Sequence, residues 1–70
     1  MKNTKKFFLN GEEFFSDQPI SLLDIINYFN YNSSLLVLEH NSFICSKENW
    51  EKIYINNKDK IEIITIVGGG

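Results

Sequence analysis

The last three residues of the sequence, Gly68, Gly69 and Gly70, have the types and spacing that most clearly suggest chemistry. Glycine has no side chain to bury and loses more backbone freedom on ordering than any other residue, so three in a row suit no packed element. An extended triglycine spans about 10 Å, and it passes through a narrow channel that larger side chains would block. We therefore expect this segment to carry the carboxylate of Gly70 into the active site of a partner.

The α-carboxyl group of Gly70 is the reactive group in this hypothesis. Such a group has a pKa of about 3.5 and is ionised at neutral pH. As a nucleophile it can attack the α-phosphate of ATP to form an acyl-adenylate, from which a sulfur nucleophile then displaces AMP. The alternative is that the glycines are simply a frayed end of the chain, as termini often are.

The other chemically capable residues do not suggest a catalytic site. The acidic residues are scattered without a spacing typical of acid/base catalysis, and we expect most of them to be solvated. Cys45 is expected to be a structural thiol, and His40, five residues away, a turn residue. The sequence shows no ligand set for a metal and no phosphate-binding loop. We therefore expect a carrier or co-substrate that is not an enzyme and binds no metal or cofactor itself.

Length and composition limit the classes of protein to consider. Seventy residues make one domain with a thin core, and a net charge of −2 gives no indication of nucleic-acid or anionic-membrane binding. No apolar run approaches the roughly 18 residues of a membrane span, and the apolar run 7–9 is too short for a signal peptide. A single cysteine indicates a reducing compartment. Alanine and arginine are absent, which indicates an AT-rich genome and a cytoplasmic or plastid-stroma location.

The first half of the chain predicts a hairpin and a helix. Asn10-Gly11 between two apolar runs is a strong signal for a β-hairpin, in which we expect Phe7 and Leu9 to face inward. After Pro19, Ser21 and Asp24 form a near capping box at the start of a helix. The apolar face of this helix is predicted to consist of Leu22, Ile25, Ile26 and Phe29.

The second half predicts short strands joined by turns. The strands are expected at residues 35–39, 43–45, 53–55 and 61–67, with turns at 30–34, 40–42 and 56–60. Ser46 is predicted to cap a one-turn element over residues 47–52, with Trp50 as its anchor. This order predicts an α+β β-grasp, or ubiquitin-like, mixed sheet in which the last strand lies parallel to the first. Residues 1–67 are expected to form this domain, and residues 68–70 a flexible tail.

Alternation along the last predicted strand divides its side chains between two faces. Ile61 and Ile63 point one way, and Glu62, Ile64 and Ile66 point the other. If the first set packs on the helix, Ile64 and Ile66 lie on the outer face beside the tail and form an apolar docking patch. The alternative is that they are ordinary outward isoleucines of a short sheet.

Several short sequence motifs, taken together with the expected fold, indicate a family. They are Glu39 with Asn41, then Lys47, Glu48 and Trp50, then Asp59, Ile61, Glu62 and Ile63, and finally Val67-Gly68-Gly69-Gly70. Together they resemble the ThiS family, the sulfur carrier proteins of thiamine biosynthesis, over nearly the whole chain. The phenylalanine-rich opening is the part least typical of that family.

The resemblance implies a reaction cycle with three partners. An adenylating enzyme of the ubiquitin-activating type binds ATP and Mg²⁺ and activates the carboxylate of Gly70. A cysteine desulfurase or sulfur relay protein then supplies the sulfur of a thiocarboxylate. Thiazole synthase docks the tail and takes this sulfur. Partner contacts are expected at Gly68, Gly69, Ile64 and Ile66.

Three other interpretations fit the same sequence. The small subunit of molybdopterin synthase is also a β-grasp thiocarboxylate carrier, but it is usually longer and tends to have prolines shortly before its diglycine, whereas this chain has only Pro19. A protein-conjugating modifier would use the same carboxylate to form isopeptide bonds. A non-catalytic β-grasp interaction domain would carry the glycines incidentally.

Overall fold

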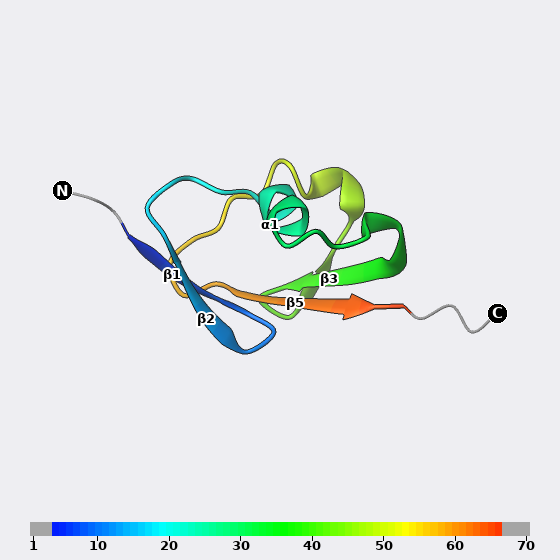
Figure 1. Ribbon diagram of the computed structural model, residues 1–70, viewed down its shortest axis with the longest axis horizontal. Helices are drawn as coiled ribbons and strands as arrows, with labels where there is room; N and C mark the ends of the chain where they lie inside the picture. Colours follow the sequence, from blue (N-terminus) through cyan, green and yellow to red (C-terminus); the bar gives the residue numbers. More distant parts are fainter. Residues whose placement is uncertain (1–3, 67–70) are drawn as a thin grey trace.

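A computed structural model describes residues 4–66, which form one mixed sheet with a single α-helix on one face (Figure 1). The elements are β1 (Lys5–Leu9), β2 (Glu12–Ser16), α1 (Leu22–Tyr28), the 3₁₀ turn η1 (Ser33–Leu35), β3 (Leu36–His40), β4 (Phe43–Cys45), the 3₁₀ turn η2 (Lys47–Asn49) and β5 (Lys60–Thr65). The strand order is β2-β1-β5-β3-β4, with β1 and β5 parallel and the other neighbours antiparallel. The expected β-grasp sheet is confirmed, and β5 is its central strand.

The opening hairpin turns at the Asn-Gly pair. Asn10 and Gly11 have φ values of 50° and 84°, the positive values that a two-residue turn of this kind requires at both positions. The side chain of Asn10 also accepts a hydrogen bond of 2.8 Å from the backbone N–H of Ile63. This contact extends the pairing of β1 with β5 beyond the end of β1.

The helix begins at the predicted capping box. The Ser21 hydroxyl accepts a hydrogen bond from Asp24 N, and the Asp24 carboxylate accepts one from Ser21 N. The helix ends where Asn30 takes a φ of 59°, a left-handed conformation that an α-helix does not continue through. Phe29, predicted on the helix face, is the C-cap residue and is half-buried.

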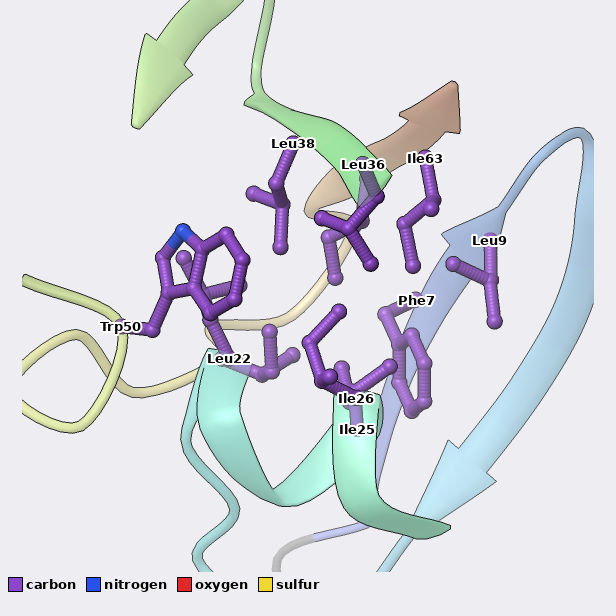
Figure 2. Packing of buried hydrophobic residues seen from close by; sticks show 11 residues of the cluster. Phe7, Leu9, Leu22, Ile25, Ile26, Leu36, Leu38, Trp50 and Ile63 are labelled. Atoms are coloured by element: carbon purple, nitrogen blue, oxygen red, sulfur yellow. The ribbon is translucent and has the colours of Figure 1, made fainter. Parts of the chain in front are cut away.

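The core fills the space between α1 and the sheet, where its side chains point toward one another (Figure 2). Its buried members are Phe7, Leu9, Leu22, Ile25, Ile26, Leu36, Leu38, Trp50, Ile55, Ile61 and Ile63. The inward orientation expected for alternate residues of β1 and β5 is therefore confirmed. Within residues 4–66, no helix has the length and apolar character needed to cross a bilayer.

Two predicted strands have different bounds in the structure. The third strand begins at Leu36, because Leu35 belongs to η1, which Asn32 caps by accepting a hydrogen bond from Ser34 N. The last strand ends at Thr65. Residue 67, the final residue of the predicted strand, lies outside the described residues, as does the predicted tail 68–70.

The expected strand at residues 53–55 is wrong. Only Tyr54 forms a bridge, and its partner is Ser21 at the start of the helix. The flanking residues bond there too, since Leu22 N donates to Ile53 O and Ile55 N donates to Ile20 O. The segment therefore pairs with the chain entering α1 and not with the sheet.

The one-turn element after β4 forms, but with a different cap. Ser46 makes no side-chain capping hydrogen bond at the start of η2. Trp50 is 2% exposed, and its indole Nε1 donates a hydrogen bond of 3.0 Å to Cys45 O. Trp50 is therefore confirmed as the predicted anchor, and it holds the segment after β4 against the core.

Candidate functional site

The predicted reactive residues, Gly68 to Gly70, lie outside the described residues, so the structure defines the strand that leads to them. β5 is bounded by β1 on one side and by β3 on the other. Ile66 follows β5 directly, and its N–H donates a hydrogen bond of 2.7 Å to Leu35 O. The chain is therefore hydrogen-bonded to the residue before β3 as far as the last described residue.

The side chains of β5 divide between the two faces of the sheet. Ile61 and Ile63 are 1% and 7% exposed in the core, whereas Ile64 and Ile66 are 51% and 52% exposed. The exposure expected for the two predicted docking residues is thus observed, and partner binding by them stays a prediction.

The outer face of the sheet has more apolar residues than the sequence analysis identified. Val37 is the register partner of Ile64, and Ile44 is the partner of Glu39, so Val37, Ile44 and Ile64 share this face. Ile44 is 74% exposed. We call Val37, Ile44 and Ile64 the outer patch. Neighbouring side chains of a strand point to opposite faces. With Cys45 taken as the inward residue of the predicted strand 43–45, this rule could have placed Ile44 outward.

A polar cluster ties the start of β5 to the end of β3. Asp59 is 6% exposed, and its carboxylate accepts hydrogen bonds from Asn41 Nδ2 at 3.0 Å and from Asn56 N at 2.8 Å. His40 Nε2 lies 2.8 Å from the same carboxylate. In return, Asn41 Oδ1 accepts a hydrogen bond from Lys60 N. These bonds lock the turn before β5 against the β3–β4 turn.

Two sequence expectations are corrected by this cluster. Asp59 was expected in a turn, among acidic residues that are mostly solvated, and it is a buried acceptor. His40 was expected to lie in a turn, and it is the last residue of β3 with its ring against Asp59. The interaction joins residues 19 positions apart, and local turn chemistry gives no indication of such a contact. The cluster positions β5, and among residues 4–66 no group of three or more His, Cys, Asp or Glu is arranged to hold a metal.

The cluster predicts a specific loss of stability in acid. Burial acts to raise the pKa of Asp59, but the hydrogen bonds from Asn41, Asn56 and His40 outweigh it and hold the pKa below its ordinary value. Because the pKa of Asp59 is lower in the folded than in the unfolded protein, the ionised carboxylate stabilises the fold. This stabilisation is fully present above the unfolded-state pKa of about 3.9, and it is lost as the pH falls through the folded-state pKa. We expect Asp59→Asn to cost about 1–3 kcal/mol in urea unfolding at pH 7.

The same measurement at low pH provides the check. Between pH 7 and pH 3 the wild type should lose more stability than Asp59→Asn, because the variant has no carboxylate to protonate at this position. Equal losses in the two proteins would contradict the assigned role. Glu12→Gln, which removes an exposed carboxylate at the start of β2, is the charge-matched control.

Cys45 has the environment of a structural thiol. It is half-buried, and burial together with the nearby Glu48 carboxylate raises the pKa of the thiol. The thiolate is the nucleophilic form, so a raised pKa makes this sulfur a weak nucleophile at neutral pH. We expect Cys45→Ser to retain full activity in any sulfur-transfer assay, and a loss of transfer in a folded variant would make Cys45 the reactive group.

Comparison with known proteins gives consistent matches over the whole chain. The model of the ThiS family matches residues 3–70. An uncharacterized protein, ycf40, from Trieres chinensis is 61% identical over 70 residues, which are 100% of this chain and 96% of that protein. The ycf40 protein of Porphyra purpurea is 45% identical over 62 residues, 89% of this chain and 87% of that one.

Two further matches concern proteins with more informative names. A thiazole synthase from Paramagnetospirillum magneticum is 28% identical over 65 residues, which are 93% of this chain but 20% of that protein. The crystal structure of the thiamine biosynthesis protein ThiS from Geobacter metallireducens superposes with a TM-score of 0.78, covering 93% of this chain and 99% of that one. Its sequence is 16% identical, so this likeness establishes the fold.

Proposed function

Because the chain belongs to the ThiS family, we propose that it is a sulfur carrier protein that delivers sulfur from a thiocarboxylate at Gly70. The observation that carries the proposal is the family match, which includes the triglycine and the strand leading to it. The fold supports it, since the central strand β5 leads to Ile66, which is hydrogen-bonded to Leu35 O at the point where the chain continues toward Gly70. The protein acts as a co-substrate of other enzymes.

The chemistry follows from an activated carboxylate. An oxygen of Gly70 attacks the α-phosphate of ATP, pyrophosphate leaves, and the acyl-adenylate forms in an adenylating enzyme that holds ATP and Mg²⁺. The terminal persulfide sulfur of a cysteine desulfurase or a relay protein then attacks the acyl carbon, and AMP leaves. A thiol cleaves the resulting acyl disulfide, which releases the thiocarboxylate of Gly70 and leaves a disulfide on the sulfur donor. Gly68 and Gly69 allow the chain to enter the narrow site in which these steps occur.

We further propose thiazole synthase as the acceptor of the sulfur. The matching protein from Paramagnetospirillum magneticum is named a thiazole synthase, and the segment like this chain is 20% of its length. A carrier-like segment and a thiazole synthase on one polypeptide are a sign that the two act together. This observation favours thiazole synthase over the molybdopterin alternative.

The relatives also bear on the location of the protein. Those from Trieres chinensis and Porphyra purpurea are named ycf40, a designation of plastid-genome reading frames. The lack of alanine and arginine, with seven lysines as the basic residues, fits an AT-rich plastid genome. We propose that the protein functions in the plastid stroma.

Reconstitution tests the proposed function. The purified chain is incubated with the adenylating enzyme, Mg·ATP, a cysteine desulfurase, cysteine and a thiol reductant, and the intact mass is measured. The expected result is the gain that corresponds to replacing one oxygen by sulfur, located at the C-terminal peptide and dependent on ATP. A chain that stays unmodified beside a ThiS protein that is modified would overturn the proposal, and an isopeptide product would indicate a protein modifier.

A substitution in the outer patch is expected to weaken partner binding without unfolding the domain. Ile64→Asp places a charge where the partner's apolar surface would cover it, so the affinity for the adenylating enzyme should fall about tenfold or more. Tyr54→Asp is the matched control, since Tyr54 is 54% exposed and lies at the N-terminal end of α1, away from the outer patch. Binding is measured by calorimetry, and equal affinities would remove the outer patch from the docking surface.

A further inference from the structure

Two glutamates lie directly opposite each other on neighbouring strands of the outer face. Glu39 on β3 and Glu62 on β5 are direct register partners, so their side chains lie on the same side of the sheet. The next register pair along these strands is Val37 with Ile64, and Ile44 lies opposite Glu39 on β4. The pair of glutamates is thus bordered by the outer patch.

This arrangement has no stabilising role within the domain. Like charges directly opposite each other on neighbouring strands destabilise a sheet. Between residues 4 and 66, neither Glu39 nor Glu62 takes part in an ion pair, since the pair found in that range joins His40 and Asp59. Lys60 is the nearest outward cation along β5, and its partner across the sheet is Phe8. Within the described residues, the folded chain therefore forms no ion pair with either carboxylate.

We propose that Glu39 and Glu62, on the outer face where the adenylating enzyme is proposed to dock, together receive one arginine side chain of that enzyme. This inference rests on the proposed function. When the outer patch is covered, the carboxylates between its members lose water, and buried carboxylates require a cationic partner. An arginine suits the site best, because its planar group donates to two carboxylates at once.

The position of the pair on the sheet supports the choice of occupant. Glu62 and Ile64 lie on the strand that continues through Ile66 toward Gly70. An enzyme that receives the end of the chain therefore comes near these residues. An apolar surface with a single basic group is complementary to this face in both charge and polarity.

The test separates binding from stability. Glu39→Gln, Glu62→Gln and the double variant keep the shape of the side chains and remove the charge, and Glu51→Gln on the exposed turn after η2 is the charge-matched control. Each full-length protein is titrated with the adenylating enzyme at low and high salt, and each is unfolded with urea. The double variant should bind about tenfold or more weakly than the wild type, with a smaller salt dependence. Its unfolding midpoint should be equal or higher, because the repulsion is gone.

The outcomes distinguish this inference from the proposed function. A double variant that binds within twofold of the wild type and of Glu51→Gln overturns the inference, while sulfur transfer to the wild type still supports the carrier role. A wild type that neither binds the adenylating enzyme nor acquires sulfur overturns both. Weaker binding accompanied by a lowered unfolding midpoint would also overturn the inference, because the glutamates would then have a structural role.

Discussion

A chain extended by one alanine after Gly70 is expected to fold normally and to lose sulfur transfer almost completely. The extension moves the terminal carboxylate about 3.5 Å along the channel and places an amide where the reacting oxygen should be. Misplacement by about 1 Å can reduce a rate 100-fold, so we expect transfer to fall at least about 1,000-fold. The measurement is the rate of the mass gain caused by exchange of oxygen for sulfur in the reconstituted mixture.

A second extended protein controls for the added residue. One alanine placed before Met1 changes the length equally and leaves the carboxylate of Gly70 in place, so its rate should equal that of the wild type. Both proteins should have the same urea midpoint. If the chain extended after Gly70 is modified at the wild-type rate, the reactive group lies elsewhere.

The other large effect is expected in the core, where Trp50→Ala should leave the domain mostly unfolded at 25 °C. Removing a buried tryptophan typically costs about 3–5 kcal/mol, and the single core of a domain of this size rarely provides more than about 3–5 kcal/mol. The substitution also removes the hydrogen bond from the indole to Cys45 O, which holds the segment after β4 in place.

Graded substitutions separate packing from hydrogen bonding. Trp50→Phe retains much of the apolar contact and loses the indole donor, so its stability should lie between those of the wild type and Trp50→Ala. Tyr28→Phe is the control, because Tyr28 is 82% exposed and the substitution keeps its ring against Phe29, so stability should change by less than about 0.5 kcal/mol. The stability of all three variants is measured by urea unfolding followed by circular dichroism. A fully folded Trp50→Ala protein would contradict the role of Trp50 as the anchor of this segment.

The elements set by neighbouring residues could be predicted from the sequence. Asn10-Gly11 determines a hairpin through its own φ values, and Ser21 with Asp24 caps the helix within one turn, so both were predicted correctly. The β-grasp order followed because a hairpin, a helix and a returning strand allow few connections. Residues 53–55 were misassigned because their partner is the chain around Ser21, more than 30 positions earlier.

In the candidate site, too, features set by neighbouring residues could be predicted from the sequence, and features set by distant contacts could not. Alternation along β5 was enough to predict the exposure of Ile64 and Ile66. The opposition of Glu39 and Glu62 depends on the register between β3 and β5, which no residue pattern in the chain specifies. The burial of Asp59 likewise depends on tertiary contacts. The role of Gly70 was derived from carboxylate chemistry and family resemblance, and it stays a prediction because that residue lies outside the described part of the chain.

The position of β5 has a consequence for protein synthesis. Among the strands of residues 4–66, the central strand β5 is synthesised last, so β1 and β3 have no neighbour between them until translation has passed residue 65. A polypeptide aborted before residue 60 lacks this strand and cannot close its core. Such fragments should be degraded rather than accumulate as decoys that occupy the enzymes of the cycle.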